Sequence, residues 1–217
     1  MAFLYENISC QNPANRSYIN RNMVLVRCEF LNNHSGAQAI RDKALALAKA
    51  VNPRAANASV NQRDTERLII DGLGGVLAEH GWYYYIRQVF GPVVEFTDFT
   101  EAHNQIDLLL NNGKSIEVRS SFPRNGAKFA VCSERFNFKN ICKYDNIYKP
   151  SETDKDFFSA VLFETPKDQM LEVDKVVFYL VGGSTKAMMM DENIAIVDNL
   201  IAEGDTTSQR TNYLVIK

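Results

Sequence analysis

Three charged side chains fall within a pair of short apolar runs where strands of a sheet are expected. Asp107 precedes the run 108–110, and Glu117 and Arg119 alternate with apolar residues in the run 115–119. Both β-propensity and burial favour apolar residues at such positions, so the two acids call for another explanation. Carboxylate oxygens are ligands that Mg²⁺ prefers, and a guanidinium binds phosphate oxygens firmly. Together the three residues suggest a metal site that acts on a phosphate.

The turn between the two runs decides whether the acids meet. Residues 111–113 are Asn-Asn-Gly, and glycine tolerates the positive φ that tight hairpin turns require. A three-residue loop with Gly113 in the left-handed conformation places Asp107 directly opposite Glu117, with Cβ atoms roughly 4.5–5.5 Å apart. A two-residue turn at 112–113 would place the acids on opposite faces. We predict the three-residue turn, with Asp107, Glu117 and Arg119 on one face of the hairpin.

This arrangement resembles the PD-(D/E)XK nuclease superfamily, the fold of many restriction endonucleases and of several repair and resolvase nucleases. In that family an Asp begins one strand of a hairpin and a Glu-x-Lys motif follows on the next strand. Asp107 and residues 117–119 occupy those places, and the resemblance covers roughly residues 60–183. Two positions depart from the family pattern, because Ile106 stands where the family name implies proline and Arg119 stands where lysine is usual.

The resemblance implies an α/β fold with a restriction endonuclease-like core, in which helices flank a mixed β-sheet. We expect a single domain, with residues 1–58 as an N-terminal extension and residues 59–217 as the core. Apolar periodicity, β-propensity and turn residues predict the elements, and residues 57–60 resemble a linker. The predicted elements are helices at 37–51, 61–80 and 186–193, the last capped by Ser184 and Thr185, and strands at 23–30, 82–90, 157–164, 173–181 and 212–216.

The resemblance also implies a Mg²⁺-dependent or Mn²⁺-dependent endonuclease that hydrolyses DNA, such as a type II restriction enzyme. Asp107 and Glu117 are the expected metal ligands and, with Arg119, the expected catalytic residues. A guanidinium does not lose its proton in a protein. Arg119 is therefore expected to stabilise charge on the phosphate and not to accept a proton.

Many members of this family take a further acid from a helix ahead of the hairpin. Glu66, near the start of the predicted helix 61–80, is the first match, and Asp64 and Glu79 are further candidates. An acid in the first turn also complements the helix dipole, which is an alternative role for Glu66.

Residues 119–149 differ in composition from the rest of the chain. Basic residues outnumber acidic ones there, and aromatic residues are interleaved with them. Cations neutralise phosphates while aromatic rings stack on bases, so this segment is suited to nucleic-acid contact. A solvated loop whose phenylalanines anchor it to the core is the alternative. The candidate DNA-binding residues are Arg124, Lys128, Arg135 and Lys139.

The composition limits the classes of partner. With a formal net charge of −2, the chain as a whole does not attract nucleic acid, so DNA must be bound by a local basic patch. No window reaches the roughly 18 apolar residues of a membrane span, and the N-terminus lacks the pattern of a signal peptide. We therefore expect a cytoplasmic protein with no membrane partner. The four cysteines form no CxxC pair and no zinc spacing, so we expect reduced, mostly buried thiols.

Two other functions fit the same residues. One is a nuclease-like domain that binds nucleic acid or a partner protein without cutting, which the arginine at position 119 and the near-neutral charge favour. The other is an unrelated α/β protein in which Asp107 and Glu117 are sheet-edge charges that discourage aggregation. DNA is the expected partner, and cleavage of both strands at a symmetric site would favour a homodimer.

Overall fold

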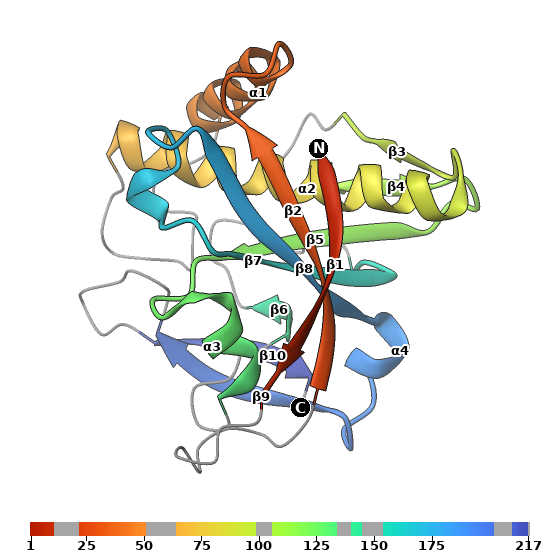
Figure 1. The fold of residues 1–217 in the computed structure, drawn as a ribbon. Helices are drawn as coiled ribbons and strands as arrows, with labels where there is room; N and C mark the ends of the chain where they lie inside the picture. The colour runs from red at the N-terminus through yellow and green to blue at the C-terminus, as the bar shows by residue number, and fades with distance from the viewer. Residues whose placement is uncertain are drawn as a thin grey trace.

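A seven-stranded mixed sheet forms the centre of the fold (Figure 1). The computed structural model describes residues 1–10, 22–50, 64–98, 106–133, 140–144, 154–201 and 210–216. The strands lie in the order β1-β2-β8-β7-β5-β4-β3. Their bounds are Ala2–Ser9 (β1), Asn22–Leu31 (β2), Val94–Phe96 (β3), Leu108–Leu110 (β4), Ser115–Ser121 (β5), Phe157–Phe163 (β7) and Lys175–Thr185 (β8).

A second, three-stranded sheet and four α-helices complete the described part of the chain, which confirms the mixed α/β class. The N-terminal region supplies β1, β2 and α1, so the segment expected as an extension contributes two strands to the large sheet. The smaller sheet contains β6 (Asn140–Tyr144), β10 (Arg210–Ile216) and β9 (Ala195–Ile201) in that order. The helices are α1 (Ala37–Ala50), α2 (Thr65–Phe90), α3 (Gly126–Cys132) and α4 (Lys186–Met189), with a 3₁₀ turn at Lys167–Gln169.

The strand order places β5 in the interior of the large sheet, between β7 and β4. Neighbouring strands run antiparallel except β5 and β7, which are parallel and pair Ile116 with Phe157. Parallel neighbours need a crossover connection, and the chain between them contains α3. Glu117 and Arg119 therefore lie on a strand with a neighbour on each side.

Helices α2 and α3 cover opposite faces of this sheet. Leu73 and Leu77 of α2 share a buried cluster with Val161 and Phe163 of β7. Leu162, which lies between those two β7 residues, belongs to a second cluster with residues of α3. Successive side chains of a strand point to opposite faces, so each cluster fills one side of the sheet.

The helix α2 is longer than predicted, and the predicted strand at 82–90 is wrong. Gly81 was expected to end the helix, but it is buried in the middle of it. A Cβ at Gly81 would lie 2.7 Å from Cε2 of Phe178, so glycine lets the helix approach β8 closely. The aromatic residues that suggested a strand pack along the helix, where the Tyr83 ring stacks on Phe96 with centroids 4.1 Å apart. Tertiary packing has overridden local propensity here.

Most of the other predicted elements are present, some with shifted ends. β2, α1, β7 and β10 occur where strands and a helix were predicted. Thr185 caps α4 by accepting the Met188 N–H at 3.2 Å, as predicted, but the helix ends at Met189. β8 continues through Gly183, where a Cβ would lie 2.5 Å from the Phe158 carbonyl oxygen. The strands β1, β3, β6 and β9 and the helix α3 were not predicted, and the linker proposed at 57–60 lies outside the described residues.

The expectation that all four cysteines are reduced is wrong for two of them. Cys10, after β1, and Cys132, at the end of α3, form a disulfide across 122 residues of sequence. Cys28 is a free buried thiol whose pKa burial raises to about 12. The Cys142 side chain lies outside the described residues. Of the helices that the structure describes, none is long and apolar enough to cross a membrane.

Candidate functional site

The hairpin of β4 and β5 has the predicted three-residue turn. Leu108 pairs with Ile116, the Gly113 N–H donates to the Leu110 carbonyl at 2.8 Å, and Gly113 has a φ of 81°. Continuing this register by one residue places Asp107 opposite Glu117, on the same face of the hairpin.

The regular ladder between the two strands ends at Asp107. The Val118 N–H donates to Oδ2 of Asp107 at 2.6 Å, so a carboxylate takes the place of a main-chain acceptor. The hydroxyl of Thr97 donates to the Ile106 carbonyl, which gives that main-chain acceptor a different partner. Asp107 is only 8% exposed, and this hydrogen bond from the Val118 amide fixes its carboxylate against the main chain of β5. The first acid is therefore held rigidly where β4 leaves β5.

Arg119 lies beside the second acid, as the alternation along β5 predicts. Its Nη2 is 3.3 Å from Oε1 of Glu117, and the two side chains are 22% and 12% exposed. A guanidinium stays protonated in such a setting, so the pair combines a fixed positive charge with a carboxylate. The hairpin thus brings Asp107, Glu117 and Arg119 together.

A third acid, Glu79, is largely buried in the middle of α2. Burial raises the pKa of Glu79, Lys43 lowers it, and the negative charge of Glu117 raises it further, with a raised pKa as the result. Oε2 of Glu79 lies 3.2 Å from Nζ of Lys43 on α1. That ammonium also lies 4.6 Å from the centre of the Phe96 ring on β3. Ile116 and Val118 of β5 pack on the α2 side of the sheet. Successive side chains of a strand point to opposite faces, so Glu117 points away from Glu79, and its charge acts on Glu79 from across the sheet.

The structure does not bring Glu66 to this region. Glu66 is exposed in the first turn of α2, thirteen residues before Glu79. At about 1.5 Å of rise per residue, that separation is roughly 20 Å along the helix. Asp64 is the N-cap of the same helix and accepts the Arg67 N–H at 2.7 Å. These two positions fit a role in helix stability.

Glu79, named above as a further candidate, lies within the predicted helix 61–80, whose buried stripe already placed it near the sheet. Val76 and Leu77 belong to the buried stripe of α2, so the next turn of the helix must also lie near the sheet. His80 confirms this placement, because its ring lies 4.6 Å from Phe96, and burial lowers its pKa to about 4.

The basic segment is described only in part. Arg124 and Lys128 are exposed near the start of α3, on the face of the sheet opposite α2. Arg135 and Lys139 lie outside the described residues. The segment expected as a loop therefore includes α3, whose buried residues anchor it to the sheet. Arg124, just before α3, and Lys128, within it, are exposed to solvent.

The donor set at the hairpin fits a simple Mg²⁺ site. Mg²⁺ is usually held by one or two carboxylates, with waters and substrate phosphates as its other ligands. Asp107 and Glu117 supply two carboxylates on one face. Within the described ranges, no group of three or more His, Cys, Asp or Glu residues is placed to hold a metal ion. The residues thus support two protein ligands and no larger cage.

Comparison with known proteins yields no relative: no family model, no curated protein and no solved structure matches the chain. The geometry itself removes one alternative for the acids. Sheet-edge charges are found on edge strands, but β4 lies between β3 and β5, and β5 lies between β4 and β7. Arguments about function therefore rest on the chemistry of the hairpin.

Proposed function

We propose that this protein is a metal-dependent endonuclease that hydrolyses phosphodiester bonds in DNA, built on a restriction endonuclease-like core. The observation that carries the proposal is the pairing of Leu108 with Ile116, a register that, continued by one residue, sets Asp107 opposite Glu117. Arg119 lies 3.3 Å from Glu117. These are the positions at which the sequence resembles the PD-(D/E)XK superfamily. A type II restriction enzyme is the kind of member that we favour.

The resemblance also implies a further acid on a helix ahead of the hairpin, and α2 precedes β4 in the chain. Glu79 is the α2 acid whose pKa the charge of Glu117 raises. It lies on the other face of the sheet from Glu117, so we assign the metal to Asp107 and Glu117 and give Glu79 no part in holding it.

Each residue has a defined task in the proposed reaction. Asp107 and Glu117 would hold Mg²⁺ or Mn²⁺, which when bound lowers the pKa of a water and offsets charge on the phosphate. The Val118 amide keeps the Asp107 carboxylate in place without a rearrangement of the chain. Arg119 would donate hydrogen bonds to a phosphate oxygen and keep its proton throughout.

A non-cutting nuclease-like domain that binds nucleic acid or a partner protein is the second candidate. Its support is that the acids already have cationic neighbours, Arg119 beside Glu117 and Lys43 beside Glu79. Internal ion pairs of this kind stabilise a fold without any metal. This candidate shares the fold and the exposed cations of α3 with the leading proposal, and differs in lacking the chemical step.

Cleavage of supercoiled plasmid DNA distinguishes the two. With Mg²⁺ or Mn²⁺ supplied, we expect the wild type to nick or linearise plasmids and Glu117→Gln to be inactive. Glu95→Gln, at an exposed acid on β3, is the matched control and should cut like the wild type. No cleavage by the wild type across plasmids of varied sequence would replace the nuclease with the non-cutting domain.

A further inference from the structure

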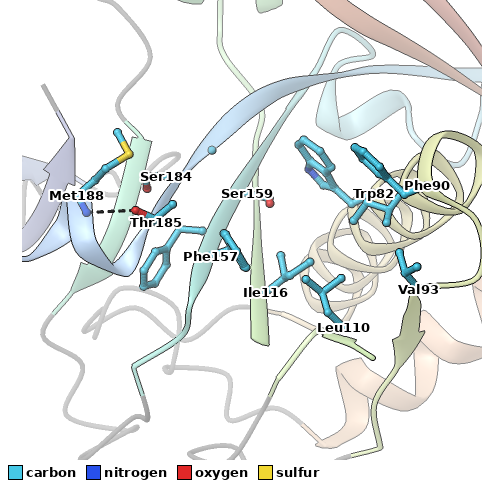
Figure 2. Close-up of a pocket in the computed structure, with 13 residues that line it drawn as sticks. Trp82, Phe90, Val93, Leu110, Ile116, Phe157, Ser159, Ser184, Thr185 and Met188 are labelled. Atoms are coloured by element: carbon cyan, nitrogen blue, oxygen red, sulfur yellow. Dashed lines mark hydrogen bonds between the residues drawn. The ribbon is translucent and has the colours of Figure 1, made fainter. Parts of the chain in front are cut away.

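A cavity of about 670 Å³ lies between the C-terminal half of α2 and the ends of the central strands. Figure 2 shows Trp82 and Phe90 on the helix side, with Phe157 and Met188 across the cavity. This volume falls within the range of about 300–1,000 Å³ that is usual for small-molecule sites. The main apolar side chains that line it are Trp82, Ile86, Phe90, Ile116, Phe157 and Met188.

The cavity exists because two small residues lie side by side on its floor. Ser159 of β7 pairs with Gly183 of β8, and both line the cavity. A Cβ at Gly183 would lie 2.5 Å from the Phe158 carbonyl oxygen, so no larger residue fits there without moving the backbone. The space above this pair is left open, while the large side chains of α2 form the wall.

The lining selects a neutral ligand. None of the described residues around the cavity carries a charge, so a phosphate, a carboxylate or a metal ion would find no partner. The side chains with polar groups are Trp82, Ser159, Ser184 and Thr185. The Thr185 hydroxyl oxygen already accepts the Met188 N–H, which leaves its own O–H to donate.

The size of the cavity argues against a second copy of the chain as the occupant. A stable protein interface buries about 800 Å² on each partner, and the walls of this cavity expose far less than that. A small molecule fills such a space without needing a further contact surface.

We propose that this cavity binds a small, neutral, mostly apolar molecule whose polar group lies against the hydroxyls of Ser159 and Thr185. The site is separate from the acids of the hairpin, and the proposal does not depend on nuclease activity. Leu110 and Ile116 of the hairpin line the cavity, whereas Glu117, the next residue of β5, points to the opposite face of the sheet.

Trp82 provides a direct reporter of binding. It is the single tryptophan of the chain, so all tryptophan emission comes from the cavity wall. Its Nε1 is shielded from solvent and has no hydrogen-bond partner among the described residues. A ligand against the indole ring should change both the intensity and the wavelength of this emission.

The test uses N-phenyl-1-naphthylamine, a neutral apolar dye, as the probe. We expect saturable binding at one site with energy transfer from Trp82, and displacement of the dye by 1-decanol. Decanoate should displace it at least about tenfold less effectively, because a buried carboxylate has no counter-charge here. Absence of saturable binding, or equal displacement by the alcohol and the acid, would overturn the proposal.

Ser159→Leu fills the floor of the cavity and should weaken dye binding at least about tenfold. Ser9→Leu makes the same exchange at an exposed position of β1 and should bind like the wild type. If Ser159→Leu does not fold, Met188→Phe narrows the cavity from α4 and leaves the main-chain cap intact. Unchanged binding in the folded filling variant contradicts the proposal. So does a dimer in sedimentation that Phe90→Asp converts to a monomer, since two copies would then meet at this face.

Discussion

The hairpin acids and the apolar cavity lie on opposite faces of the same strand, and their chemistry is opposite. Glu117 pairs with Arg119 on one face of β5, and Ile116 lines the cavity on the other. No described residue that lines the cavity is charged. The sheet therefore separates a polar region from an apolar one, and changes to either should leave the other intact.

Loss of the guanidinium should have the largest effect and should be confined to the hairpin. Arg119→Ala removes a group expected to stabilise charge on the phosphate, so we expect DNA cleavage to fall roughly 10²–10³-fold. Arg119→Lys keeps a positive charge and should retain activity or raise it. Cleavage rates test the loss of activity. Dye binding to the cavity tests whether the effect is confined to the hairpin, because the dye affinity should not change in either variant.

If Arg119 is only an internal counter-ion, the pattern differs. The wild type and the Lys variant would then both be folded and inactive, which would favour the non-cutting domain.

Removal of the disulfide should weaken the scaffold of both regions alike. The Cys10–Cys132 bond closes a loop of 122 residues and ties the end of β1 to α3. Replacing both cysteines with serine should lower the free energy of unfolding by about 2–4 kcal/mol, measured by urea denaturation. The same loss should appear in wild-type protein treated with reductant under denaturing conditions and refolded reduced. A double variant as stable as the wild type would show that the bond adds nothing to the fold.

The contrast between the regions also explains what the sequence could predict. The hairpin depends on residues within fourteen positions of one another, so turn chemistry and alternation were enough to place Asp107 opposite Glu117. Glycine commonly follows the last turn of a helix, so Gly81 was predicted to lie outside one. Its packing against Phe178, nearly 100 residues away, could not be seen from the local sequence. That error shortened α2 and left residues 82–90, which form the cavity wall, assigned to a strand.

The disulfide and the extra strands escaped prediction for a related reason. Cys10 and Cys132 have no spacing signature, and only the packing of α3 below the sheet brings them together. The strand β1 follows no strict alternation, because it is an edge strand with most of its residues exposed.

Removal of the helix cation should affect stability and leave metal binding unchanged. Lys43 lies 3.2 Å from Glu79, on the opposite face of the sheet from Glu117. Lys43→Gln leaves that carboxylate without its cation, so we expect the free energy of unfolding to fall by roughly 0.5–1 kcal/mol in urea denaturation. Lys49→Gln, at an exposed position of the same helix, is the control. A changed Mn²⁺ affinity in Lys43→Gln would mean that Glu79 belongs to the metal site.

The smallest effect is expected for the loss of Arg124 and Lys128, the exposed cations at the start of α3. If Arg124 and Lys128 each contact a phosphate, replacing both with alanine should reduce the slope of log DNA affinity against log salt by roughly two units. The measurement is a salt titration of binding by fluorescence anisotropy, with metal omitted to prevent cleavage. Lys49→Ala, on the opposite side of the sheet, should leave the slope unchanged. An unchanged slope in the double variant would show that these cations are only solvated.

Metal binding tests the central claim most directly, because the proposed function requires Asp107 and Glu117 to hold one ion together. Titration calorimetry with Mn²⁺ should show one site in the wild type that is lost in both Asp107→Asn and Glu117→Gln and kept in Glu95→Gln. A wild type that binds no Mn²⁺, or Asp107 and Glu117 variants that bind it as the wild type does, would contradict the account.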